Sequence, residues 1–152
     1  EFMNRALPAP PGEVALAPAP IAAAAADLRA SFDEVHGGLG GAPKFPHPCE
    51  LAFCLRATVS NGDTRLRELV LLTLEKMARG GIYDQLGGGF CRYSVDQYWQ
   101  IPHFEKMLYD NGPLLKLYAD AWLITGNPLF ARAAGTPGSS NQNSAPPPGA
   151  GS

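Results

Sequence analysis

The sequence predicts an all-α fold: about four helices in hairpin order, with a short irregular or β-hairpin insertion among them. Several segments between residues 21 and 134 place apolar side chains at three- and four-residue steps. Short turns rich in glycine, asparagine and proline separate these segments. A stretch crowded with glycines and aromatic residues, 80–111, lies between two of the helical patterns. Together these features indicate one helical domain with one irregular element.

Composition divides the chain into three parts. Residues 1–20 are rich in proline and alanine, which predicts a disordered linker. Residues 21–134 carry the helical patterns and form the predicted domain. From residue 135 onward the sequence contains no large apolar side chain, so residues 135–152 are expected to be a disordered, non-native tail.

The first predicted helix is expected to end at the glycine pair Gly37-Gly38. The loop after it, 37–46, is interrupted by glycines and prolines and presents Lys44 and Phe45. We expect Lys44 to be exposed to solvent; the alternative is that it contacts an anionic ligand. The apolar stripe of this helix consists of Ile21, Ala25, Leu28, Phe32 and Val35.

The second and third helices are predicted to form an antiparallel hairpin. Pro48 suits the first turn of the second helix, residues 60–62 form the turn, and Asp63 is a good N-cap for the third helix. Gly80-Gly81 ends that helix. The predicted buried residues are Leu51, Cys54, Leu55 and Thr58 in the second helix, and Leu66, Leu69, Val70, Thr73, Leu74 and Met77 in the third.

The irregular stretch predicts a short β-hairpin. Residues 89–94 and 98–101 are its expected strands, and 95–97 its turn. Pro102 is then expected to open a helical turn that bears His103 and the residues after it.

Gly112-Pro113 is expected to break or kink the chain, with Asp110 or Asn111 capping a new helical start. The fourth helix ends at Gly126, and Asn127-Pro128 predicts the N-cap and first position of a short fifth helix. The apolar stripe of the fourth helix consists of Leu114, Leu117, Tyr118, Ala121, Trp122 and Thr125.

Charge and composition exclude several classes of partner. The net charge is −2 and no basic cluster occurs, which argues against nucleic acid. No run of 18 apolar residues occurs, so no membrane span is expected. The three cysteines form no CxxC pair, which favours a reducing, cytoplasmic setting. No metal site is predicted, because no CxxC or HxxxH spacing organises the possible zinc ligands His47, Cys49, Cys91 and His103. No cofactor is predicted either, and Gly87-Gly88-Gly89 lacks the Lys-Ser/Thr of a nucleotide phosphate loop.

Blocks of sequence in the irregular stretch carry a family resemblance. GGIYDQLGGGF, RYSVD, a tryptophan and PHFEKMLYDN follow one another, and GGLGGAPKFPHP precedes them. Through these blocks residues 33–134 resemble the YyaL family, also called the spermatogenesis-associated thioredoxin-domain proteins. The resemblance implies an N-terminal thioredoxin-like domain, then a toroid of paired helices similar to sugar epimerases and six-hairpin glycosidases. This chain would hold the opening portion of that (α/α) toroid. Cys91 and Gly112-Pro113 depart from the family pattern, which commonly has histidine at the first position.

The resemblance also implies that residues 80–111 project into the funnel of the toroid, where the active site of such enzymes lies. An epimerase needs positioned bases, for which His103 is best suited at neutral pH. Arg92 is a candidate for holding an anionic group. A glycosidase needs two carboxylates, and the candidates are Asp84, Asp96, Glu105 and Asp110.

Each candidate also has a structural interpretation. His103 can cap a turn, and Glu105 and Asp110 can stabilise the positive end of a helix. Tyr83 and Trp99 can stack on a sugar ring or fill the core.

Two hypotheses for function follow. In the first, the parent protein binds or acts on a carbohydrate, and this chain holds part of the site but is inactive on its own. In the second, the chain is a folding or self-association module. A homo-oligomer with the fourth helix at its interface is expected, because an open toroid leaves apolar side chains without neighbours. These are Leu114, Leu117, Trp122, Leu129 and Phe130.

Overall fold

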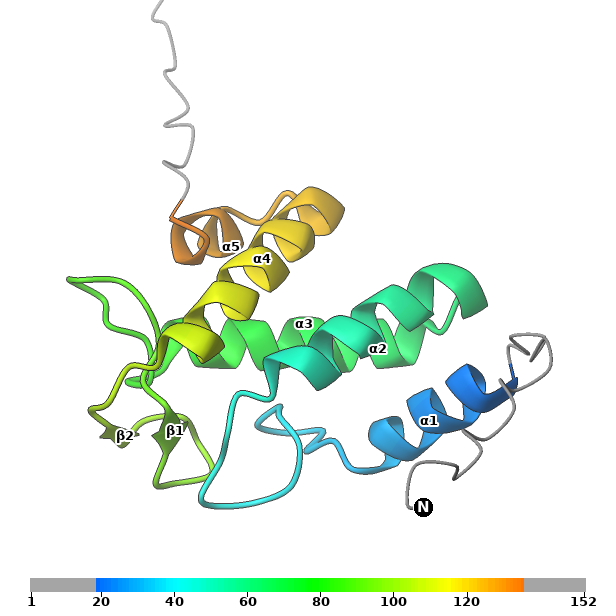
Figure 1. Cartoon of the computed structure of the whole chain (residues 1–152), viewed down its shortest axis with the longest axis horizontal. Coiled ribbons are helices and arrows are strands. Elements are labelled where there is room, and N and C mark those ends of the chain that lie inside the picture. Colours follow the sequence, from blue (N-terminus) through cyan, green and yellow to red (C-terminus); the bar gives the residue numbers. More distant parts are fainter. Residues whose placement is uncertain (1–18, 136–152) are drawn as a thin grey trace, which may run out of the picture.

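The computed structural model describes residues 19–135. Within that range the chain is mostly helical, as the sequence predicts, with one small sheet (Figure 1). The predicted linker up to residue 18 and the predicted tail from residue 136 lie outside the described residues. No helix among residues 19–135 is long and apolar enough to span a bilayer. The elements are α1 (Ala19–Ala30), α2 (Pro48–Asn61), α3 (Thr64–Arg79), β1 (Tyr93–Ser94), β2 (Pro102–His103), α4 (Leu108–Thr125) and α5 (Pro128–Ala133).

The hairpin of α2 and α3 is confirmed. The two helices lie side by side in Figure 1, joined by a turn at Gly62 and Asp63. Gly62 ends α2 in the left-handed conformation, and the Asp63 carboxylate caps α3 by accepting from the Leu66 amide at 2.9 Å. Every side chain predicted to be buried on these two helices is buried.

The first helix is shorter than predicted. α1 ends at Ala30, and the chain then turns before Gly37-Gly38 is reached. The cause is Asp33, whose carboxylate accepts hydrogen bonds from the amides of Val35 and His36 and so replaces the next helical turn with a tight loop. Val35, predicted to continue the apolar stripe, is exposed.

The predicted β-hairpin exists, but its second strand lies later in the chain. Tyr93 pairs with His103 and Ser94 with Pro102, in antiparallel register. The prediction that Pro102 opens a helical turn is therefore wrong. Proline is tolerated because β2 is a two-residue edge strand. The loop 95–101 closes the hairpin.

The predicted break at Gly112-Pro113, with Asp110 or Asn111 capping a new helix, is also wrong: α4 begins at Leu108 with Met107 as its N-cap and continues through Pro113. The residue before a proline is normally driven out of the helical region by clashes that involve its Cβ. Gly112 has no Cβ, so it can remain helical, and the helix loses the hydrogen bond that the Pro113 nitrogen would donate. Gly126 ends α4 and the Asn127 side chain caps α5, both as predicted.

One hydrophobic core lies between α2, α3, α4 and α5. The Tyr118 hydroxyl donates to the Leu74 carbonyl at 2.8 Å, which ties α4 to α3 inside this core. Leu114, Leu117 and Phe130, which were expected to lack neighbours, are buried, because α5 packs against α4 and α3. The exposed apolar residues of α4 are others: Leu108, Tyr109, Leu115, Leu123 and Ile124.

Candidate functional site

Two loops, 32–39 and 83–90, share the same set of hydrogen bonds and flank the candidate site. In the first, the Asp33 amide donates to the Gly38 carbonyl at 2.9 Å. One carboxylate oxygen of Asp33 accepts from the amides of Val35 and His36, at 2.9 and 2.8 Å. The other accepts from Lys44 Nζ at 2.7 Å. Both carboxylate oxygens of Asp33 therefore take part in hydrogen bonds that hold this loop closed.

The second loop repeats these contacts. The Asp84 amide donates to the Gly89 carbonyl at 2.9 Å, and one carboxylate oxygen accepts from the amides of Leu86 and Gly87. Lys106 Nζ lies 2.6 Å from the other oxygen. Both loops share a pattern of aromatic residue, aspartate, three residues, two glycines and an apolar residue, which is visible in the sequence at 32–39 and 83–90.

These contacts keep both aspartates ionised. Burial alone would raise the pKa of Asp33, but hydrogen bonds from Lys44 and from two backbone amides lower it to about 2. The hydrogen bond from Lys106, followed by those from Gly87 and Leu86, lowers the pKa of Asp84 to about 2. A general acid must carry a proton near neutral pH. Asp84, a predicted catalytic candidate, is therefore placed to shape the loop, and this pKa does not suit a proton donor.

Lys44 is fully buried, so the expectation that it faces solvent is wrong. Its Nζ donates to Asp33 and to the Gln97 carbonyl at 3.1 Å, and it lies 5.5 Å from the centre of the Trp99 ring. These partners replace the water that a buried ammonium loses. Lys44 thereby ties the first loop to the loop of the β-hairpin and does not reach a surface ligand.

Asp96 organises the loop of the hairpin. Its carboxylate accepts from the Ser94 hydroxyl and from the amides of Tyr98, Gln100 and Ile101. Burial works to raise the pKa of Asp96, but these hydrogen bonds outweigh it and lower the pKa. The loop geometry thus depends on the ionised carboxylate.

Tyr83 and Trp99, the aromatic candidates for stacking on a sugar, are buried. Trp99 Nε1 donates to the His36 carbonyl at 2.9 Å, and its ring packs closely over Gly38. The Tyr83 ring lies 4.8 Å from that of Phe90. Of the two interpretations that the sequence allows, the structure therefore matches the one in which these rings fill the core.

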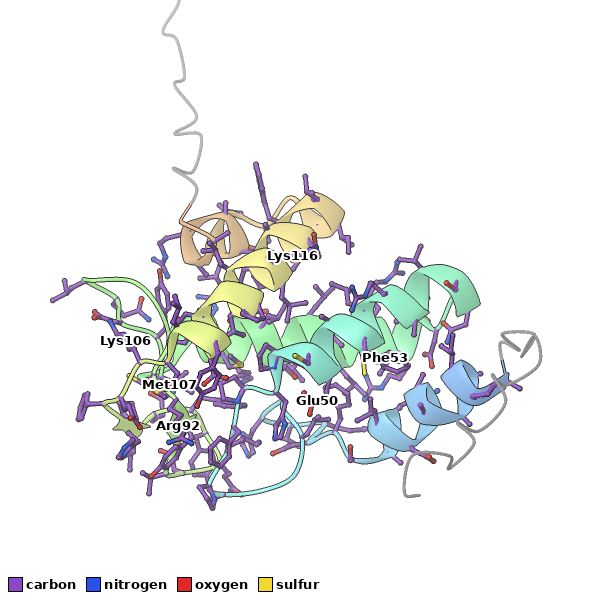
Figure 2. The ribbon with its side chains drawn as sticks, in the orientation of Figure 1. Glu50, Phe53, Arg92, Lys106, Met107 and Lys116 are labelled. Carbon is purple, nitrogen blue, oxygen red and sulfur yellow. The ribbon has the colours of Figure 1, made fainter. Side chains whose placement is uncertain are left out.

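The remaining candidates meet at one surface beside the β-hairpin. The Arg92 amide donates to the Glu105 carbonyl at 2.7 Å, and Arg92 Nη1 lies 3.4 Å from Glu105 Oε2. His103 Nε2 lies 3.7 Å from the same carboxylate oxygen. All three side chains are roughly half exposed, so they are open to a ligand. Figure 2 shows Arg92 at the end of the molecule that carries β1 and β2, away from α1.

A row of aromatic rings lies beside these charged groups. The Tyr93 and His103 rings stack in parallel at 4.7 Å, and the Phe45 ring lies 4.9 Å from Tyr93 on a tilted plane. His47 follows, 6.3 Å from Phe45. Two regions distant in sequence, the loop that carries Phe45 and His47 and the β1–β2 hairpin, therefore build this row. Phe45, His47 and Tyr93 were not among the predicted site residues, although they stand inside the conspicuous blocks KFPHP and RYSVD.

Asp110 completes the surface from the first turn of α4. Burial raises the pKa of Asp110, and the nearby charges of Arg92 and His47 act in the opposite direction. Within residues 19–135 its carboxylate makes no side-chain hydrogen bond or ion pair. We call this surface the polar-aromatic face; it consists of Phe45, His47, Arg92, Tyr93, His103, Glu105 and Asp110.

The structure therefore separates the predicted site residues into two groups. Those on the polar-aromatic face are Arg92, His103, Glu105 and Asp110. Those that shape loops or fill the core are Lys44, Tyr83, Asp84, Asp96 and Trp99. Across the described residues 19–135, no three His, Cys, Asp or Glu side chains are arranged to hold a metal ion.

Comparison with known proteins gives relatives for most of the chain. No family model matches it. Spermatogenesis-associated protein 20 of Rattus norvegicus is 45% identical over 111 residues, which cover 70% of this chain, and the Homo sapiens protein of the same name is 41% identical over the same length. The chain is homologous to part of these proteins. An uncharacterized protein of Caenorhabditis elegans is 46% identical over 101 residues, or 64% of the chain. In each case the match spans only 14% of the relative's length.

Proposed function

We propose that this chain is part of the helical domain of a YyaL-family protein, and that its polar-aromatic face forms one wall of a carbohydrate site. The homology to spermatogenesis-associated protein 20 over 111 residues supports the family assignment, as does the order of the sequence blocks. The 14% coverage of those relatives supports a parent protein much longer than this chain. The observation that carries the functional proposal is the meeting of aromatic and ionisable side chains on one open surface.

Such a surface suits a sugar for two physical reasons. The exposed rings of Phe45 and His103 offer apolar area to the C–H faces of a pyranose. Arg92 offers donors, and the carboxylates of Glu105 and Asp110 offer acceptors, for the hydroxyl groups around the ring.

The same groups can move protons. Asp110 has a raised pKa and no charged partner within hydrogen-bond distance among residues 19–135, which suits a proton donor. Glu105 lies 3.4 Å from Arg92 and is the candidate for the base or nucleophile. Two carboxyl groups in unlike environments favour glycoside cleavage. His103, stacked on Tyr93, supports the alternative of proton abstraction in an epimerase.

One wall does not surround a sugar, so we expect this chain to bind weakly and to show no turnover by itself. The test is a ligand screen of a longer parent protein beside this chain, with His103→Ala, Glu105→Gln and the distant control Glu68→Gln. The proposal expects turnover or tight binding of a sugar by the parent, lost in the first two variants and kept in the control. Sugar binding that none of the three substitutions changes would overturn the proposal.

A second candidate function is self-association. The observation in its favour is a groove between α2 and α4 with a volume of about 400 Å³, beside the exposed side chains of Val59, Leu123 and Ile124. Apolar surface of this kind favours contact with a second chain. Sedimentation over a wide concentration range tests it: a dimer that Leu123→Glu dissociates is expected, and a monomer at high micromolar concentration would contradict it.

A further inference from the structure

The basic side chains around the polar-aromatic face are already paired. Lys44 is buried against Asp33, and Lys106 lies 2.6 Å from Asp84 and donates to the Gly88 carbonyl at 2.8 Å. Neither ammonium is therefore free to attract a ligand.

Arg92 is the remaining permanent cation of the face, and Glu105 neutralises it at 3.4 Å. The two imidazoles also have carboxylate neighbours: His47 Nδ1 lies 3.3 Å from Glu50 Oε1, and His103 Nε2 lies 3.7 Å from Glu105. An anionic ligand would have to compete with these carboxylates for every positive group that it met.

Negative charge is left over on the same surface. Glu50 has only an imidazole as its partner among residues 19–135, and Asp110 has no ion pair there. Glu105 pairs with the one guanidinium of the face, that of Arg92, and Glu50 adds a carboxylate at the edge, beside His47. Carboxylates therefore outnumber the guanidinium even when Asp110 carries a proton. At neutral pH the surface around the aromatic row is net negative, in contrast to the Arg clusters that recognise phosphate or carboxylate groups.

Resting on the proposed carbohydrate site, we infer that the polar-aromatic face selects neutral and amino sugars and rejects uronic acids and sugar phosphates. A neutral sugar donates its hydroxyl hydrogens to the carboxylates. An amino sugar adds an ammonium group that the same carboxylates attract. A uronate or a sugar phosphate places a negative charge beside them, and repulsion between unit charges about 4 Å apart in water weakens binding about fivefold.

The experiment measures binding of matched sugars to the whole chain by saturation-transfer NMR. The probes are a methyl glycoside, the amino sugar, the uronate and the 6-phosphate, each in the gluco, galacto and manno configurations. At an ionic strength of about 20 mM, we expect the amino sugar to bind tightest and the two anions at least about fivefold more weakly than the glycoside. About 0.5 M salt should shrink these differences, because it screens charges at the surface.

Two variants connect the selectivity to this surface. Glu50→Gln removes a carboxylate at the edge of the polar-aromatic face and should reduce the difference in affinity between the glycoside and the anionic sugars. Glu68→Gln, which removes an exposed carboxylate of α3, should leave this difference in affinity unchanged. Anions that bind as tightly as the glycoside, or a difference that Glu50→Gln does not alter, would overturn the inference while leaving the carbohydrate site standing. Failure of every sugar to bind would instead overturn the proposed function and this inference with it.

Discussion

Replacing the buried lysine tests how the loops beneath the candidate site are held. In Lys44→Met the side chain keeps similar length and apolar bulk, but the Asp33 carboxylate and the Gln97 carbonyl lose their donor. Breaking a buried ion pair by removing one partner costs about 3–5 kcal/mol. The Asp33 side chain is 20% exposed and keeps two backbone donors, so a value near the lower end, about 3 kcal/mol, is expected.

The assay is urea unfolding followed by far-ultraviolet circular dichroism, with Lys116→Met as the matched control. Lys116 also lies 2.7 Å from a carboxylate, that of Asp120, but its side chain is 71% exposed. Its loss should cost about 0.5 kcal/mol or less. Adding Asp33→Asn to Lys44→Met should recover part of the stability, because no buried charge then lacks a partner. If Lys44→Met unfolds within about 1 kcal/mol of the wild type, the buried pair does not anchor these loops.

Three further outcomes are expected. Asn111→Ala should lower the free energy of unfolding in urea by about 2–3 kcal/mol. The reason is that the Asn111 amide makes three hydrogen bonds to backbone groups of the second glycine loop and of the start of α4. A decrease below about 0.5 kcal/mol would contradict this role. The pKa of Asp33 in the folded protein, about 2, is depressed below its ordinary 3.8, so the stability that its ionised carboxylate contributes is present above about pH 4 and is lost as the pH falls toward 2. The melting temperature of Asp33→Asn should therefore depend less on pH than that of the wild type between about pH 4 and pH 2. An unchanged pH dependence would refute this role of Asp33. Gly38→Ala should lower the melting temperature more than Gly40→Ala. Both residues have positive φ, but only a Cβ at Gly38 would meet the Trp99 ring, at 2.5 Å. Equal decreases in melting temperature would show that the Trp99 ring can shift to accommodate the added methyl group.

Local signals made the central helices predictable. Asp63 caps α3 and Gly62 ends α2 through contacts within a few residues, and the apolar stripes of both helices match the buried faces. The C-terminal end of α4 and the start of α5 were predictable for the same reason, from Gly126 and from Asn127-Pro128. Caps and stripes depend on near neighbours, so a single sequence contains them.

Contacts between distant residues could not be predicted in the same way. Lys44 is buried because Gln97 and Trp99 lie over it, more than fifty residues away, and nothing beside Lys44 in the sequence indicates this. β2 forms because Tyr93 pairs with His103, which overrides the helical start that Pro102 suggests. The carboxylate turn at Asp33, by contrast, has a signal in the sequence, because the same aspartate and glycine pattern recurs at 83–90.

The sequence predicted which stretch of the chain carries the candidate site, but not the full set of residues that form its surface. Sequence reasoning placed Arg92, His103, Glu105 and Asp110 together, and the structure brings them to one face. It did not anticipate that Phe45 and His47 join them, since the loop that carries these residues belongs to a segment more than forty residues earlier.

The most direct test of the central proposal is a map of sugar binding on this chain by amide and side-chain chemical-shift changes in a ¹⁵N-labelled sample. A neutral methyl glycoside is titrated to tens of millimolar. We expect shifts at the Arg92 side chain and at the amides of Tyr93, His103, Glu105 and Asp110. These shifts should be absent in His103→Ala and retained in Glu68→Gln. Shifts confined to the groove between α2 and α4, or no shifts at any concentration, would contradict it.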